Sequence, residues 1–303
     1  MAQQDRYETT KEHQDDLKTL HSMGYAQELS RRMGAFQNFA ISFSIICILA
    51  GGITAFPLSL SAAGGASVGY GWPLACGFAL LVAAAMGQIA SAYPTAGGIY
   101  HWASLLGGRG YGWCAAWFNL LGLMFVVSSV NFGVFLLFRD LFLANVMGMD
   151  VSAWTSKEFM DQGWWTQTLF ITAITIAQAV LNHVGIRATT ILTDFSGYLI
   201  FVFAVLLTLG LLAYAPSIDL GRLFTFSNFS GEAGGSVWPT AMQSVGFVFL
   251  LGLLQGVYTV TGFDASAHTA EETRNAAREA PRGMLHSVFW SVAFGYVMIC
   301  AFI

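Results

Sequence analysis

The feature that most constrains this chain is a series of long apolar stretches separated by short polar connections. About 20 consecutive apolar residues suffice for an α-helix to cross the hydrocarbon core of a bilayer. Only 10% of the 303 residues are charged and 55% are hydrophobic, whereas soluble domains carry about 25% charged residues. The sequence therefore predicts an all-α polytopic membrane protein. We expect seven membrane-spanning segments, at residues 36–63, 72–92, 111–138, 164–184, 190–214, 240–268 and 284–303.

The distribution of Lys and Arg predicts the orientation of these segments, because cytoplasmic loops retain basic residues. If residues 1–35 form a cytoplasmic tail, the outer side holds Arg139, Lys157 and Arg222, and the other basic residues lie inside. We therefore expect a multi-pass protein of the cell membrane with a cytoplasmic amino terminus. Within the polar tail, residues 15–29 are expected to form a short amphipathic helix.

The polar residues exclude several classes of function. No His, Cys or carboxylate cluster has metal-ligand spacing, and no nucleophile stands beside a plausible base, so the sequence does not indicate an enzyme. The net charge is −4, and no basic face indicates nucleic acid. The cysteines lie inside apolar segments, where free thiols are usually buried, so no disulfide framework is expected. They are Cys47, Cys76, Cys114 and Cys300.

The first apolar segment contains weak helix formers near its centre. Two adjacent glycines are followed by a β-branched pair, and Pro57 comes one turn later. In lipid, an unwound backbone persists only where it is buried in protein or lines a cavity. We therefore interpret this stretch as half of a binding site, in which the free N–H groups of residues 52–54 attract an anionic group. The stretch consists of Ala50, Gly51, Gly52, Ile53 and Thr54.

Segment six repeats this pattern, with a second weak point between Gly256 and Gly262. The offset of five segments is odd, so the two helices run in opposite directions and their breaks can face each other, as in an inverted repeat. The expected acceptors for a cation are the carbonyls of Val257, Tyr258 and Val260. For either segment alone, a kink or a helix-packing role of the glycines remains the alternative.

The inverted repeat divides the chain into a tail, residues 1–35, and a transmembrane domain, residues 36–303. Segments one to five form the first repeat at about residues 36–214, and residues 240–303 begin the second. A complete second repeat needs at least three further segments. We therefore expect the chain to be truncated, with part of the machinery missing after its seventh segment.

Several polar residues near segment six are candidates for gating or structural roles. Intramembrane ionisable residues are functional candidates by default, so Asp264 could couple transport to an ion or proton. We favour the other interpretation, in which it caps the second half-helix. Glu271 and Arg274 form either a solvated pair or part of an inner gate, and the sequence leaves both open. The loop at residues 93–110 is expected to hold a short helix that closes the cytoplasmic side.

Three motifs together resemble the amino acid, polyamine and organocation permease superfamily. They are Ala50-Gly51-Gly52, the loop Pro94-Thr95-Ala96-Gly97-Gly98-Ile99-Tyr100, and Gly262-Phe263-Asp264 followed by Glu271-Glu272-Thr273. The run from Phe263 to His268 with Pro281-Arg282 looks most like the amino acid and choline transporter branch, which includes GABA permeases. The resemblance covers about residues 30–303. It implies the leucine-transporter fold, with five-plus-five inverted repeats and secondary transport by alternating access.

The resemblance also implies that the substrate contacts lie at the two breaks described above. Where many members have glycine first, this chain has Ala50, a departure that bears on the carboxylate geometry. Some proton-coupled relatives carry a lysine in segment five, and sodium-coupled relatives use an eighth segment. This chain has no Lys after Lys157, so the coupling ion stays open between proton and sodium, and no cofactor is expected.

The leading hypothesis is a secondary active transporter in the lipid bilayer. Its small-molecule substrate is an amino acid or a related amine such as GABA or choline. The alternative hypothesis is a transporter-like receptor or partner subunit that binds a ligand without transporting it. The sequence does not indicate the oligomeric state.

Overall fold

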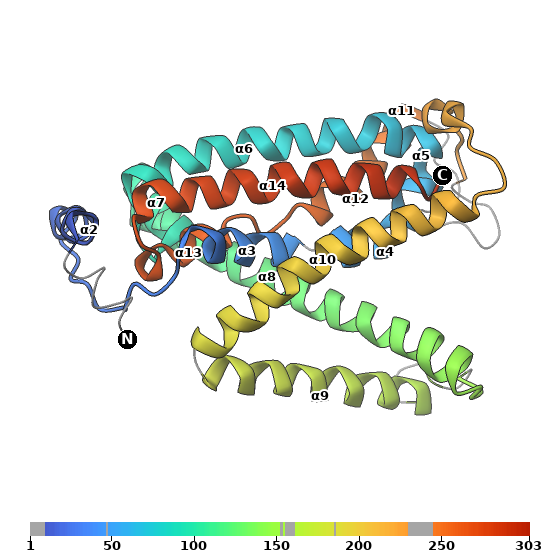
Figure 1. The fold of residues 1–303 in the computed structure, drawn as a ribbon, viewed down its shortest axis with the longest axis horizontal. Helices are drawn as coiled ribbons and strands as arrows, with labels where there is room; N and C mark the ends of the chain where they lie inside the picture. The colour runs from blue at the N-terminus through green and yellow to red at the C-terminus, as the bar shows by residue number, and fades with distance from the viewer. Residues whose placement is uncertain (1–9, 47, 152–153, 155–160, 185, 230–244) are drawn as a thin grey trace. The chain divides into compact units, whose positions relative to one another are not determined.

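The computed structural model describes residues 10–46, 48–151, 154, 161–184, 186–229 and 245–303 (Figure 1). Within these ranges the only β pairing is an isolated bridge between Met33 and Thr273. Six helices are long and apolar enough to cross a membrane, and a shorter apolar helical stretch covers residues 246–259. The predicted class, an all-α polytopic membrane protein, is confirmed. The chain forms two compact units, Met1–Gly112 with Thr193–Ile303, and Trp113–Leu192.

The first predicted segment consists of three helices, α3 (Ala35–Ile46), α4 (Ile48–Thr54) and α5 (Phe56–Ala63). The interruption between α4 and α5 falls at Ala55, and α5 carries Pro57 in its first turn. The expectation of an unwound stretch at residues 51–54 is therefore wrong, because these residues form the end of α4. Proline has no N–H and cannot continue a preceding helical ladder, so it sets the break downstream of the glycines.

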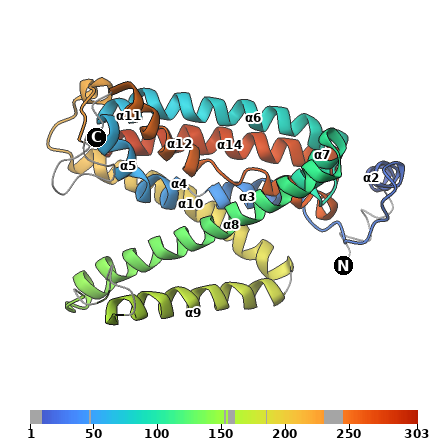
Figure 2. The same cartoon turned by 180° about the vertical axis from the view of Figure 1, so that it is seen from behind.

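Two long helices lie side by side in the first unit, as both views show (Figures 1 and 2). One is α6 (Trp72–Ala92), which follows the π-helical η1 (Ser67–Gly71), and the other is α14 (Ala276–Cys300). Gly295 permits their close approach, because a Cβ there would lie 2.8 Å from Cζ2 of Trp72. The Trp72 ring nitrogen donates to the carbonyl of Val292 at 3.3 Å. The buried core of this unit surrounds Trp72.

The seventh segment begins earlier than predicted. It is predicted at residues 284–303, whereas residues 276–283 already form the first turns of α14. The Asp16 carboxylate accepts hydrogen bonds from the backbone N–H groups of Asn275, at 2.8 Å, and Ala276, at 3.3 Å. These groups lie at the start of the helix and have no intrahelical partner of their own, so the tail residue stabilises the earlier start.

The sixth predicted segment is interrupted, as expected. Its described part contains α11 (Val245–Gly252), α12 (Leu254–Thr259) and α13 (Ala265–His268), followed by η5 (Ala270–Glu272). The chain turns between Thr259 and Ala265. Gly262 has a φ of +98°, a conformation that glycine adopts without strain. The segment is thus a set of short helices, and it does not count among the six long spans.

Two short helices of the first unit lie outside the spans. α7 (Gly98–Gly107) confirms the short helix expected in the loop at residues 93–110. In the tail, α2 (Lys11–Ser22) begins and ends earlier than the helix predicted at residues 15–29. Its start is fixed by Thr10, whose hydroxyl accepts from the N–H of His13 at 3.3 Å, as an N-cap does.

The connection after α10 (Ile186–Tyr214) contains η4 (Leu220–Phe224) and folds back onto the end of α5 and onto η1. Gly65 and Gly69 permit this contact, because a Cβ at either position would overlap the carbonyl of Arg222 or Leu223. The N–H of Ala66 also donates to the carbonyl of Thr225 at 3.1 Å.

The second unit contains most of α8 (Arg109–Leu137), the π-helical η2 (Phe138–Val146), α9 (Gln162–Val184) and the first turns of α10. Polar side chains join α8 to α9. The amide of Asn131 donates to Thr175 and Gln178, both at 3.1 Å, and Gln178 returns a hydrogen bond at 2.9 Å. Such interhelical hydrogen bonds replace the hydrophobic driving force that is absent between helices in lipid.

Candidate functional site

The interrupted helices of segments one and six meet through closely packed glycines. A Cβ at Gly51 would lie 3.1 Å from Cα of Thr259, so the backbones of α4 and α12 are in contact there. A Cβ at Gly256 would lie 2.9 Å from Cβ of Ala75, on α6. These positions accept only a small residue at the present helix spacing. The structure therefore brings the two predicted weak points together.

A buried amide joins the two segments at the same place. Nε2 of Gln255 on α12 donates to the carbonyl of Gly52 at 3.0 Å, and the hydroxyl of Ser59 on α5 donates to Oε1 of Gln255. Sequence reasoning missed Gln255. The available signal was an amide placed in an otherwise apolar run, because a polar side chain in such a position needs a partner. We name Gly51, Gly52, Ser59, Gln255 and Thr259 the interruption junction.

The predicted substrate residues of segment one differ in exposure. Gly51 and Gly52 are buried, Ala50 is half-buried, and Ile53 and Thr54 are exposed. The N–H groups of residues 52–54 lie inside α4, so they do not project into a gap as expected. The Thr54 hydroxyl donates to the carbonyl of Ala50 at 2.6 Å. The Thr54 hydroxyl thus finds its hydrogen-bond partner within α4 itself.

The predicted substrate residues of segment six also separate. Val257 is exposed and Tyr258 is half-buried, whereas Val260 is buried in the core around Trp72. The carbonyl of Val257 accepts from the Thr261 hydroxyl at 2.8 Å, and that of Tyr258 accepts from the Thr261 N–H at 3.3 Å. The carbonyl of Tyr258 also accepts from the N–H of Val260. A carbonyl has two lone pairs, so that of Val257 remains able to accept from a ligand.

On the side nearer the tail, segments one and six are joined by hydrogen bonds between buried side chains. Nδ2 of Asn38 on α3 lies 2.8 Å from the carbonyl of Ser266, 3.1 Å from the Thr269 hydroxyl and 3.0 Å from the Thr273 hydroxyl. The hydroxyls of Ser42 and Ser266 are 2.6 Å apart, and the Ser42 hydroxyl also accepts from the N–H of Ser266 at 2.8 Å. These contacts hold α3 against α13.

Asp264 occupies the N-cap position of α13, but its side chain makes no capping hydrogen bond. The prediction that its carboxylate caps this helix is therefore wrong. Its Oδ2 instead lies 3.3 Å from Nε2 of His268, one turn along the same helix. An imidazole at this distance competes with the helix N–H groups for the carboxylate and carries a positive charge when protonated. The residue thus forms a local pair.

The tail closes over this polar cluster. The Arg31 side chain is buried and lies 3.5 Å from Oδ2 of Asp16, and it donates to the carbonyls of Ala270 and Thr273. Met33 pairs with the backbone around Thr273, since its N–H donates to Glu272 and its carbonyl accepts from Arg274. We name the set Asp16, Arg31, Asn38, Ser42, Ser266 and Thr273 the tail-side network.

Comparison with known proteins identifies the family. A sequence model of the amino acid permease family matches residues 33–303. The chain belongs to the amino acid permease family. It is 35% identical to the amino-acid permease BAT1 of Arabidopsis thaliana over 284 residues, which make up 91% of this chain and 52% of that protein.

Two further relatives agree with this membership. The rice (Oryza sativa subsp. japonica) BAT1 homolog is 32% identical over 92% of this chain and 52% of its own length. The GABA-specific permease of Saccharomyces cerevisiae is 27% identical over 94% of this chain and 48% of its own length. The chain thus spans about half the length of the curated relatives it matches.

The two residues predicted to form a solvated pair or part of an inner gate contact other parts of the chain. Oε1 of Glu271 accepts from the N–H of Ala96, in the loop before α7, at 3.0 Å. Nε of Arg274 donates to the carbonyl of Arg31 at 3.3 Å. Partial burial and the neighbouring Glu271 raise the pKa of Glu272 above its ordinary value. Glu271 and Arg274 therefore link the end of segment six to neighbouring parts of the chain, Glu271 to the loop before α7 and Arg274 to the tail.

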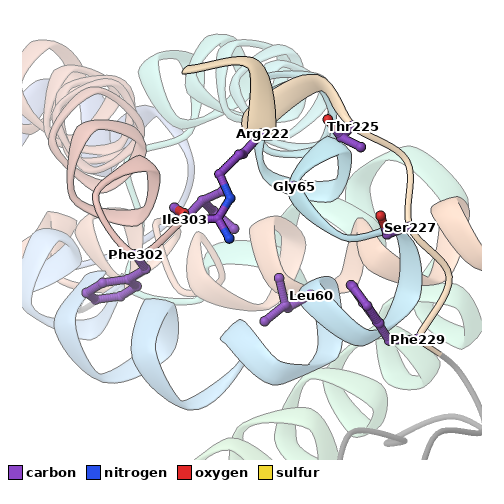
Figure 3. Close-up of a pocket in the computed structure, with 8 residues that line it drawn as sticks. All are labelled: Leu60, Gly65, Arg222, Thr225, Ser227, Phe229, Phe302 and Ile303. Carbon is purple, nitrogen blue, oxygen red and sulfur yellow. Dashed lines mark hydrogen bonds between the residues drawn. The ribbon is translucent and has the colours of Figure 1, made fainter. Parts of the chain in front are cut away.

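The chain also has a pocket at the C-terminal end of α5, away from the interruption at Ala55, as Figure 3 shows. Arg222 is the charged residue among the described residues that line it, and Nη1 of Arg222 donates to the carbonyl of Ile303 at 3.2 Å. In the part of the chain that the structure describes, none of the predicted substrate residues lines this pocket. The lining consists of Leu60, Gly65, Arg222, Thr225, Ser227, Phe229, Phe302 and Ile303.

Proposed function

We infer that the full-length protein containing this chain is a secondary transporter that moves an amino acid or a related small amine across the cell membrane by alternating access. The observation that carries this proposal is the meeting of two interrupted helices at Gly51 and Thr259. In transporters built from inverted repeats, discontinuous helices of this kind form the substrate site. Membership of the amino acid permease family supports the same conclusion.

The proposed substrate site follows the interruptions. Its members are the eight residues predicted above, with the exposed side chains of Ile53, Thr54 and Val257 nearest to a ligand. Gly51 and Gly52 are buried beside these side chains and leave no side-chain volume of their own there. Because two relatives are named as an amino-acid permease and a GABA-specific permease, α-amino acids and GABA are the first substrates to test, followed by choline.

We assign the tail-side network to the cytoplasmic face, in keeping with the predicted orientation. Alternating access requires a barrier on that face that forms and breaks during the cycle. Asn38, Ser266 and Thr273 supply hydrogen bonds suited to such a barrier, since each is weak enough to exchange for water. Glu271 and Arg274 extend it to the α7 loop and the tail.

The test is uptake of labelled amino acids and GABA by cells that express the full-length protein. A Cβ at Gly52 would lie 3.2 Å from Cε of Met298 and 3.3 Å from Cδ1 of Ile299, so the larger side chain of Gly52→Leu clashes with α14 and displaces α4 from its present position. We expect saturable uptake by the wild type and loss of at least about tenfold in the variant, a change worth ~1.4 kcal/mol. Gly77→Leu on α6 is the matched control, because a Cβ there meets open space.

Two outcomes contradict the proposal in different ways. Full uptake by Gly52→Leu, at normal abundance in the membrane, overturns the assignment of the site. No uptake by the wild type, together with a rise in its unfolding temperature when GABA or an amino acid is added, favours the alternative of a receptor or partner subunit.

A further inference from the structure

Gln255 completes the end of a helix that belongs to another segment. α4 ends at Thr54, and the last carbonyls of a helix have no partner within it. Gly52 lies in this last turn, and its carbonyl accepts from Nε2 of Gln255 at 3.0 Å. The Gln255 side chain is only 1% exposed. Its loss therefore leaves a buried polar group of segment one without this partner.

The chemistry of its partners fixes the orientation of this amide. A backbone carbonyl can only accept, so the nitrogen of Gln255 faces Gly52. The amide oxygen then faces Ser59, which is fully buried and donates its hydroxyl proton. One side chain of α12 thus holds both α4 and α5, on either side of the interruption at Ala55.

The Gln255 amide and the contact of Gly51 with Thr259 limit the spacing of α4 and α12 in opposite directions. The contact between Gly51 and Thr259 is repulsive at shorter distance, so it sets how closely α4 and α12 approach. It does not prevent them from separating. The hydrogen bonds of Gln255 are lost on separation, so they set how far apart the helices can move.

We propose that Gln255 is a positioning residue that fixes the spacing between the two helix interruptions and thereby selects substrates by length. This proposal rests on the proposed transport function. A zwitterionic substrate that contacts both segments presents its carboxylate to one and its ammonium to the other. The separation of these charges increases from alanine to β-alanine to GABA. A fixed spacing between α4 and α12 favours one member of this series over the others.

The first experiment measures competition by alanine, β-alanine and GABA against a transported, labelled substrate in the full-length protein. We compare wild type, Ser59→Ala, which removes one bond of the amide, and Gln255→Leu, which removes both. Gln88→Leu on α6 is the control, because this glutamine is exposed. We expect the ratio of the inhibition constants of alanine and GABA to change about tenfold in Gln255→Leu, and in the same direction but less in Ser59→Ala. A parallel change of all three constants, or no change, overturns the proposal.

The second experiment reads the hydrogen bonds without transport. Unfolding temperatures are measured for Ser59→Ala, Gln255→Leu and the double variant in detergent. The Ser59 hydroxyl also lies 3.1 Å from the carbonyl of Phe56, so Ser59→Ala has a cost of its own. If Ser59 acts through Gln255, the double variant loses less stability than the sum of the two single losses, as expected for coupled neighbours. Additive losses overturn the positioning role whether or not the protein transports. If the losses of the variants are coupled but the wild type shows no uptake, the proposed transport function is contradicted instead.

Discussion

The tail-side network and the interruption junction join the same two segments by different physical means. In the network, α3 meets α13 through hydrogen bonds from Asn38, and the tail adds a buried ion pair between Asp16 and Arg31. At the junction, α4 meets α12 through a glycine packed against the backbone of Thr259. The network depends on polar contacts, which can be exchanged for water once water reaches them, whereas the junction adds to the hydrogen bonds of Gln255 a close-packed contact that cannot be exchanged.

This difference predicts different sensitivities for the two regions. Deleting a polar group is expected to damage the network, because its partners stay buried. Adding side-chain volume is expected to destabilise the junction, because its helices are already in close contact. The network is therefore suited to open and close, and the junction is suited to keep a fixed geometry around a ligand.

The largest effect is expected for Arg31→Gln. Removing one partner of a buried ion pair costs up to about 3–5 kcal/mol, and the hydrogen bonds from Arg31 to the carbonyls of Ala270 and Thr273 are lost with it. Asp16 would keep its hydrogen bonds to the start of α14. We therefore expect the tail to detach from Thr273. Unfolding temperature and protease sensitivity at residues 11–34 of the full-length protein measure the two effects. Both are expected to change together.

The neighbouring Arg32→Gln provides the matched control, because Arg32 is exposed where Arg31 is 4% exposed. We expect the control to behave as the wild type. If Arg31→Gln also leaves stability and protease sensitivity unchanged, the tail does not stabilise this side, and the contrast between the two regions fails.

A smaller effect is expected for Gly51→Ala at the junction. The new Cβ would lie 3.1 Å from Cα of Thr259, and the backbone must shift to accept it. Overpacking of this kind costs about 1–3 kcal/mol. At Gly77 of α6 the same substitution meets open space and removes a poor helix former, so Gly77→Ala is expected to be neutral or stabilising. Thermal unfolding of the two variants sharpens the comparison, and equal curves would refute the close packing.

Much of the fold was predictable because the membrane imposes strict rules on sequence. Long apolar runs predicted the spans, and the loop at residues 93–110 contains the expected helix, α7. The interruption of segment six was visible in its glycines. In segment one, however, the helix continues through Gly51 and Gly52 and ends before Pro57. A glycine weakens a helix by about 1 kcal/mol, which packing can offset, whereas proline removes a donor outright.

The details of the site were less predictable, because they depend on contacts between distant residues. Asn38 and Gln255 are single amides whose long-range partners lie at least 196 positions away in the chain, so no local pattern reveals them. The sequence favoured a capping role for Asp264 over ion or proton coupling, but the side chain lies 3.3 Å from His268 and makes no capping hydrogen bond. The tail carried no readable role, since Arg31 becomes a structural residue only against the carbonyls of Ala270 and Thr273.

The smallest expected effect tests charge at the edge of the tail-side network. Partial burial and Glu271 raise the pKa of Glu272. A carboxyl with a raised folded pKa stabilises the fold fully only below its unfolded pKa, and this contribution is lost as the pH rises through the folded value. Glutamine does not ionise, so Glu272→Gln removes this loss of stability at high pH. We therefore expect a gain of about a few tenths of a kcal/mol at pH 7, reduced by solvent screening, and no gain below about pH 4. Thermal unfolding across this range measures it, with the exposed Glu12→Gln as control; a loss of stability at pH 7 would show that the Glu272 carboxylate supports the network rather than straining it.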